Sequence, residues 1–237
     1  MPLAIPDFPQ RLELLEARVS NALVRAGRAR ADVTVVAVSK KFSASAIQQA
    51  YLAGLRHFGE NYVQEFAVKQ PALADLPEAR FHFIGHLQAN KSRQAAELFQ
   101  VIHTVDSPRL LQRLDAAAHE AGKALDILLE IKLSGEESKS GTDASSIPRI
   151  LAAADSCHSV RVTGLMTMPP WSEDAETSRP YFQRLAALAR QYKLPQLSMG
   201  MSNDFEVAIE EGATLVRVGT ALFGPRPKPS PATLIAS

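Results

Sequence analysis

Cysteine and aromatic residues are scarce in this chain of 237 residues, which has one Cys, one Trp and 6% aromatic residues in all. The lone Cys157 cannot form an intramolecular disulfide, so a disulfide-stapled fold is excluded and a reducing, cytoplasmic compartment is expected. Hydrophobic residues make up 46% of the chain, far more than in a disordered or fibrous protein. We therefore expect one soluble domain of ordinary size with a sizeable core.

The chain also lacks an excess of either charge. Its 26 Lys and Arg residues offset 25 Asp and Glu residues, for a net charge of +1, so nothing attracts nucleic acid or an anionic membrane globally. No stretch approaches the roughly 18 apolar residues of a membrane span, and Met1–Asp7 has no basic segment followed by an apolar run. We expect no nucleic-acid partner, no membrane and no targeting segment, and we expect a small-molecule site.

Hydrophobic periodicity predicts an N-terminal amphipathic helix followed by short strands that alternate with helices. The N-terminal helix is expected from about Asp7 to Arg28. The predicted strands are Val33–Val38, Arg56–Gly59, Phe81–Gly85, Val101–Val105, Asp126–Leu133, Val160–Met166, Gln196–Met199 and Leu215–Gly219. The predicted helices between them are Ser43–Ala53, Asn61–Lys69, Ala89–Phe99, Pro108–Ala121, Ser145–Ser156, Glu173–Tyr192, Asp204–Glu211 and a segment after Thr220. Ser107 and Pro108 read as a helix start, and Gly122 and Gly212 as helix ends.

This alternation is typical of an α/β protein, and eight units in about 190 residues fit a (β/α)8 TIM barrel. A doubly wound open sheet is the alternative, although no Gly-x-Gly-x-x-Gly pattern follows the first strand, whereas polar residues follow nearly every strand. We expect residues 1–30 to be a helix packed on the barrel and residues 31–226 to be the barrel itself. Residues 227–237 should be a Pro-rich tail.

The first predicted strand runs directly into two lysines. Alternation along an extended strand places Lys40 on the face of Val36 and Val38, and Lys41 on the opposite face. A semi-buried lysine loses hydration, its pKa falls, and its amine becomes a nucleophile toward an aldehyde. The plain alternative is that both lysines extend into solvent from a strand end.

The last two strands end in small and polar residues. Arg217 lies on the last strand, and Gly219 and Thr220 follow it at the place where barrels commonly bind phosphate. The preceding strand runs through Ser198 to Ser202 and Asn203 before the helix from Asp204, which either helps an anion site or only caps that helix. A lysine at one end and a phosphate site at the other describe a pocket for a phosphorylated aldehyde.

Other clusters carry less chemistry. His82 and His86 share one face only in a helix, and their segment reads as a strand and turn, so no metal site is expected. His103 and Asp106 have no Ser or Cys nucleophile near them and are interpreted as a strand end packed beneath the site. The charged segment Gly135–Gly141 is either a lid or a solvated loop.

Seven segments together resemble one known family, the pyridoxal 5′-phosphate (PLP) homeostasis proteins, formerly called proline synthetase co-transcribed homologues. That family is similar in fold to the barrel domain of alanine racemase. The segments follow the family's order and are Ala37–Lys40, Phe58–Glu65, His82–Lys91, Ser138–Gly141, Gly164–Met168, Leu197–Ser202 and Val216–Gly224.

The resemblance implies a cofactor, PLP, held as a covalent aldimine on Lys40. It further implies that Arg217 faces the pyridine nitrogen and that Asn61 and His86 line the surroundings of the cofactor. Ser198, Ser202, Gly219 and Thr220 would gather around the phosphate. The implied role is to bind, shield and deliver PLP inside the cell, with PLP-dependent apo-enzymes as partners and a monomeric protein.

The same residues bear on catalysis. Arginine can only donate a hydrogen bond to a neutral ring nitrogen, so Arg217 weakens the electron sink that PLP enzymes use. In racemases of this type a second base comes from an additional β domain, and after Phe223–Gly224 we expect no residues to build one. We therefore predict no catalytic residues and little or no turnover. A PLP-dependent racemase-like enzyme is the alternative function, and a barrel that binds another phosphorylated metabolite is a third.

Overall fold

Eight parallel strands close into a barrel in the computed structural model, which describes residues 7–134 and 140–225. Each strand pairs with the next in sequence, and β8 (Leu215–Val218) returns to pair with β1 (Thr34–Val38). The remaining strands are β2 (His57–Glu60), β3 (Arg80–Phe83), β4 (Val101–Val105), β5 (Leu125–Glu130), β6 (Val160–Met166) and β7 (Gln196–Met201). The predicted (β/α)8 barrel is confirmed, because pairing of the first and last strands excludes an open sheet.

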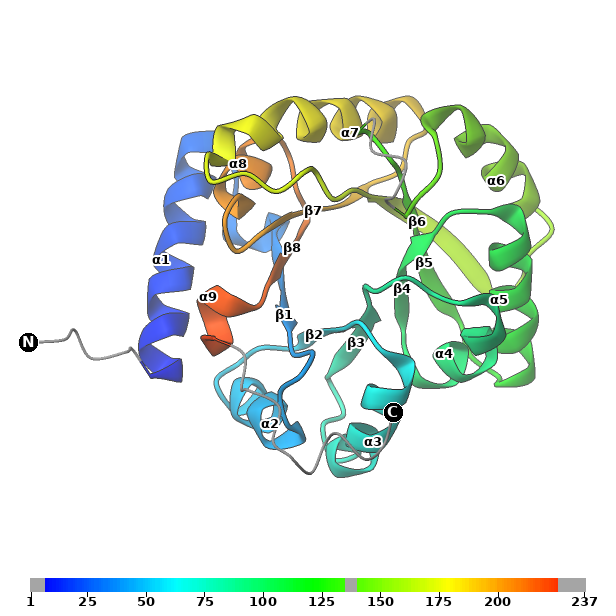
Figure 1. Ribbon diagram of the computed structural model, residues 1–237, viewed down its shortest axis with the longest axis horizontal. Coiled ribbons are helices and arrows are strands. Elements are labelled where there is room, and N and C mark those ends of the chain that lie inside the picture. The colour runs from blue at the N-terminus through cyan, green and yellow to red at the C-terminus, as the bar shows by residue number, and fades with distance from the viewer. Residues whose placement is uncertain (1–6, 135–139, 226–237) are drawn as a thin grey trace, which may run out of the picture.

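Helices form a ring outside the strands (Figure 1). They are α1 (Phe8–Ala26), α2 (Ala44–Leu52), α3 (Val63–Lys69), α4 (Ser92–Leu98), α5 (Pro108–Glu120), α6 (Ile147–Ala154), α7 (Arg179–Gln191), α8 (Phe205–Glu210) and α9 (Thr220–Phe223). Like α4, which follows a 3₁₀ turn over Ala89–Lys91, the helices α6 and α7 start later than predicted, since the predicted segments include short 3₁₀ turns before Ile147 and Arg179. In both, a proline occupies the first turn, where its missing N–H costs no hydrogen bond.

Local signals of helix ends match the structure. The Ser107 hydroxyl accepts a hydrogen bond from Leu110 N at 3.3 Å, with Pro108 in the first turn of α5. Gly122 and Gly212 end helices with φ of +62° and +97°, the left-handed region that glycine adopts without strain.

Alternate residues of the strands face two different cores. Val36, Val101, Leu128, Met166 and Leu215 form a cluster inside the barrel. Their neighbours in sequence, such as Val35 and Ala37, belong to the larger core between strands and helices. Side chains at every second position of a strand therefore point into the barrel, and those between them point toward the helices. We call this odd or even position the parity of a side chain.

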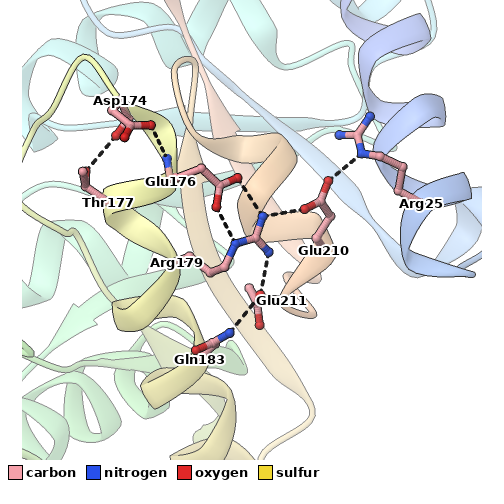
Figure 2. Close-up of polar contacts among 8 residues, drawn as sticks. All are labelled: Arg25, Asp174, Glu176, Thr177, Arg179, Gln183, Glu210 and Glu211. Carbon is pink, nitrogen blue, oxygen red and sulfur yellow. Dashed lines mark hydrogen bonds and ion pairs between the residues drawn. The ribbon is translucent and has the colours of Figure 1, made fainter.

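The N-terminal helix α1 lies beside α8 and α9 (Figure 1) and buries Leu15, Val19 and Leu23. An ion-pair cluster joins this part of the outer ring (Figure 2). Arg179 of α7 bonds Glu210 at 2.7 Å and Glu211 at 2.6 Å, and Glu210 also bonds Arg25 of α1 at 2.6 Å. Three helices are thus tied together at their polar ends.

Two predictions lie outside the described residues: the Pro-rich tail at 227–237 and most of the loop over 135–141. Within residues 7–134 and 140–225, no helix has the length and apolar character needed to cross a membrane.

Candidate functional site

A cavity of about 330 Å³ opens at the carboxyl ends of the strands, within the size range of about 300–1,000 Å³ for small-molecule sites. Six of the eight residues predicted for the site line it, and they come from β1, β2, β7 and β8 or the turns that follow. They are Lys40, Asn61, Ser202, Arg217, Gly219 and Thr220. Val38, Ile84, Met168 and Trp171 add apolar walls.

Lys40 reaches the cavity because of its parity along β1. Val36 is inside the barrel, Val38 lines the cavity, and Lys40 follows on the same face. Lys41 is exposed, with a φ of +65°, and is not among the cavity-lining residues. The turn therefore separates the two lysines, one toward the cavity and one toward solvent.

A buried polar network holds the turn on either side of Lys40. Lys69 Nζ bonds the carbonyl of Ser39 at 3.1 Å, Glu60 at 2.8 Å and Glu65 at 2.6 Å. The Glu65 carboxylate in turn accepts from the backbone N–H of Lys41 at 2.5 Å, and Ser39 Oγ donates to Glu60 at 2.8 Å. Burial raises the pKa of Glu60, although the Lys69 charge opposes this. The sequence analysis missed Lys69, although its i, i+4 spacing from Glu65 was a usable signal.

Arg217 points inward from β8 and is almost fully buried. Its Nη1 donates to Ser198 Oγ at 2.6 Å and its Nη2 to the carbonyl of Thr167 at 3.0 Å. Desolvation lowers the pKa of Arg217 to about 10, while the charges of Asp204 and Glu130 oppose that shift. The guanidinium therefore stays cationic at neutral pH.

Glu130 is a second carboxyl in this region that the sequence analysis missed. Burial raises its pKa to about 7, the Arg217 charge opposes this and Asp106 adds to it. Its Oε2 is buried without a hydrogen-bond partner among the described residues. Glu130 shares parity with Leu128 of the barrel interior, so alternation along the strand could have identified it.

Ser198 and His86 are the two predicted residues that do not line this cavity. Ser198 is fully buried on β7, and its hydroxyl bonds Arg217 and His103 Nδ1, the latter at 2.8 Å. His86 is exposed, lies 3.3 Å from Ser140 Oγ through its Nδ1, and lines a neighbouring surface cleft with Tyr62 and Lys91. The structure therefore places Ser198 below the cavity and His86 beside it.

The turns after β7 and β8 meet at one hydroxyl. Ser202 Oγ lies 3.3 Å from the backbone N of Gly219 and 3.4 Å from that of Ala221, both of which donate to it. Converging backbone N–H groups and a hydroxyl suit an anion. Capping of α8 by the Asp204 side chain is wrong, since this carboxylate instead accepts from Met201 N at 2.7 Å and from Ser178 Oγ at 2.8 Å.

The donor set fits PLP. The cavity combines an amine for an aldehyde, the hydroxyl and amide groups at Ser202 and Gly219 for a phosphate, and apolar walls for a ring. Asn61 Oδ1, also in the wall, is a buried acceptor without a partner among residues 7–134 and 140–225, so it can accept from a ligand. Over the same residues, no group of three or more His, Cys, Asp or Glu side chains is placed to hold a metal ion.

Comparison with known proteins gives consistent matches over most of the chain. The family model of the alanine racemase N-terminal domain matches residues 15–227. The pyridoxal phosphate homeostasis protein of Pseudomonas aeruginosa is 43% identical over 226 residues, covering 94% of this chain and 98% of that protein. The protein of the same name from Escherichia coli K12 is 40% identical over 227 residues, covering 93% and 97%.

Solved structures agree. PipY of Synechococcus elongatus, with PLP bound, has a TM-score of 0.80 and 39% identity, covering 92% of this chain and 100% of that one. An alanine racemase from Clostridium difficile has a TM-score of 0.71 at 12% identity, covering 95% of this chain and 60% of the racemase. The second likeness is one of fold alone.

Proposed function

The chain belongs to the pyridoxal phosphate homeostasis family, and we propose that it binds PLP in the cavity at the carboxyl end of its barrel, as part of intracellular PLP homeostasis. One observation carries the proposal. Lys40 and the Ser202–Gly219 meeting point line the same cavity from neighbouring elements, because β1 and β8 are adjacent strands. An amine and an anion site in one cavity fit the two ends of one phosphorylated aldehyde.

Each residue has a definite task in this proposal. Lys40 would supply the amine that holds the aldehyde, and the turn that bears Lys40 is held by Lys69, Glu60 and Glu65. The Ser202 hydroxyl and the backbone N–H groups near Gly219 and Thr220 bind the phosphate. Arg217 donates toward the ring nitrogen. Bound PLP supplies an aldehyde that condenses with primary amines and a ring that withdraws electrons.

The protein's own groups favour holding PLP over turning over amino acids. Arg217 remains cationic, and a guanidinium can donate to a ring nitrogen but cannot accept from a protonated one. Glu130 carries the opposite charge in this region, and its raised pKa keeps it partly protonated near neutral pH. The ring nitrogen therefore stays neutral and its electron withdrawal weak. We infer a monomeric cytoplasmic carrier that releases PLP to apo-enzymes.

The attachment residue is tested by mass spectrometry after borohydride reduction of the PLP-loaded protein. The pyridoxyl group should map to Lys40, since Lys40 lines the cavity and Lys41 faces solvent. Lys40→Ala should abolish the adduct and leave the fold intact, and the matched control Lys41→Ala should keep it. An adduct on Lys41, or a full adduct in Lys40→Ala, would overturn the assignment.

Turnover is tested by long incubation of the PLP-loaded protein with single-enantiomer amino acids, followed by chiral chromatography. We expect rates far below the roughly 1–10³ s⁻¹ of ordinary enzymes, because Arg217 leaves the ring nitrogen neutral. Racemisation at ordinary enzyme rates that disappears in Lys40→Ala would show that the protein is an enzyme.

A further inference from the structure

Three histidines cross the inside of the barrel in one hydrogen-bonded line, here called the histidine chain: His57 of β2, His82 of β3 and His103 of β4. His57 Nδ1 lies 2.9 Å from His82 Nε2, and His82 Nδ1 lies 2.8 Å from His103 Nε2. His103 Nδ1 then meets Ser198 Oγ at 2.8 Å. The line starts at the half-buried first residue of β2 and ends at the hydroxyl that contacts Arg217.

The direction of these hydrogen bonds follows from the last link. Arg217 can only donate, so Ser198 Oγ accepts from it. The hydroxyl has one hydrogen to donate, and the acceptor that the described residues offer it is His103 Nδ1. His103 therefore carries its hydrogen on Nε2 and donates to His82 Nδ1, and His82 in turn donates from Nε2 to His57 Nδ1.

The two inner histidines stay neutral in this arrangement. Burial lowers both pKa values well below 6.5, aided by the charge of Arg217 at His103 and by the neighbouring histidines and Arg80 at His82. A second proton on His82 Nδ1 would face the N–H of His103 Nε2, and one on His103 Nδ1 would remove the acceptor of the Ser198 hydroxyl hydrogen. The histidine chain is thus a fixed support with one allowed set of tautomers.

We propose that Ser198 and the histidine chain are positioning residues that hold the Arg217 guanidinium at the cavity floor, and that Ser198 takes no part in binding phosphate. Ser198 is fully buried and does not line the cavity, whereas Arg217 does. Within residues 7–134 and 140–225, the guanidinium's other hydrogen-bond acceptor is the Thr167 carbonyl, so losing the hydroxyl leaves Arg217 held from one side. The proposal rests on the proposed function only where PLP serves as a probe.

The first test needs no cofactor and reads the tautomers by NMR of ¹⁵N-histidine-labelled protein. His82 and His103 should both be neutral with the hydrogen on Nε2. In Ser198→Ala, the Nδ1 resonance of His103 should move downfield, because this nitrogen loses its donor. Exposed His119 supplies the control, since His119→Gln should leave the three resonances of the histidine chain in place. A His103 hydrogen on Nδ1 would overturn the proposal, and the wild-type spectrum decides this even if Ser198→Ala fails to fold.

The second test compares the affinities of PLP and pyridoxal, which differ by the phosphate. Ser198→Ala should weaken both by the same factor, about tenfold, because it acts through Arg217 rather than the phosphate. Ser202→Ala should weaken PLP far more than pyridoxal. Ser198→Thr, which keeps a hydroxyl, should restore most of the affinity for both.

The outcomes separate the two proposals. If Ser198→Ala weakens PLP and leaves pyridoxal unchanged, Ser198 is a phosphate ligand and the positioning role is wrong. Failure of the wild-type protein to bind PLP would contradict the proposed function, while the tautomers would still decide the direction of the histidine chain.

Discussion

At the scale of single residues, Glu130 shows how burial makes one side chain a source of pH dependence. Its pKa rises from the usual 4.5 to about 7. Between these values the folded protein holds a proton that the unfolded chain has lost. The contribution of Glu130 to the free energy of unfolding is therefore complete below pH 4.5 and disappears as the pH rises through about 7.

Glu130→Gln should remove this dependence. The difference of 2.5 pKa units, from 4.5 to about 7, corresponds to at most about 3 kcal/mol at 1.36 kcal/mol per unit. From acid to alkaline pH, the unfolding free energy of the variant should therefore rise by up to that amount relative to wild type. Urea unfolding across the pH range measures it, and exposed Glu13→Gln is the control. If the unfolding free energies of wild type and Glu130→Gln changed with pH in parallel, the raised pKa of Glu130 would be contradicted.

At the scale of elements, Arg179 shows how helices of the outer ring are joined by charge (Figure 2). It bonds Glu176 at 2.6 Å as well as Glu210 and Glu211, and these hydrogen bonds raise the pKa of Arg179. An isolated ion pair on the surface contributes about 0–1 kcal/mol to the free energy of unfolding. The Arg179 guanidinium, however, pairs with three carboxylates, and its side chain is 27% exposed. We expect Arg179→Met to lower the unfolding free energy by about 1–2 kcal/mol.

The control is Arg93→Met, whose pair with Glu97 is longer, at 3.5 Å, and whose side chain is 76% exposed. That change should cost less than about 0.5 kcal/mol. Raising the salt concentration to about 1 M should shrink the Arg179→Met effect, because exposed charges are screened within about 3 Å under those conditions. Equal effects of the two substitutions would show that the cluster is no stronger than the exposed ion pairs of Arg93 with Glu97 and Glu120.

At the scale of the whole molecule, neutral histidines inside the barrel make the fold sensitive to acid. Burial lowers the pKa values of His57, His82 and His103, so the unfolded chain binds protons that the folded protein does not. The contribution of these neutral histidines to the free energy of unfolding is complete above pH 6.5 and is lost as the pH falls below 6.5.

Proton uptake on unfolding, measured by calorimetry in buffers of different ionisation enthalpy, checks this prediction. The Glu130→Gln variant is the suitable background, because Glu130 contributes with the opposite sign. Glu60, whose pKa burial also raises, can offset no more than one of the three imidazole protons. Below pH 6.5, its stability should fall with pH and its unfolding should take up protons. Unfolding without net uptake at about pH 5.5 would mean that these imidazoles are already charged in the fold.

Much of the architecture was predictable from local pattern. Short runs rich in Val, Ile, Phe and Leu identified all eight strands, and β4 and β6 have the predicted bounds. Parity along β1 placed Lys40, rather than Lys41, at the cavity. Local pattern left two roles open for Asp204, an anion site or a helix cap. The cap is wrong, because the side chain accepts instead from Met201 N in the turn after β7 and from Ser178 Oγ.

The barrel, its strand order and the inward face of each strand could be predicted, because they depend on periodicity within short segments. The partners of the inward side chains could not, because they depend on how the barrel closes. His103 and Ser198 are 95 positions apart, and Arg217 joins them from the last strand. Closure of the barrel and the stagger of its strands bring such residues together. Burial then fixes their partners and charge states, since an interior without water leaves each polar group only the neighbours that the fold provides.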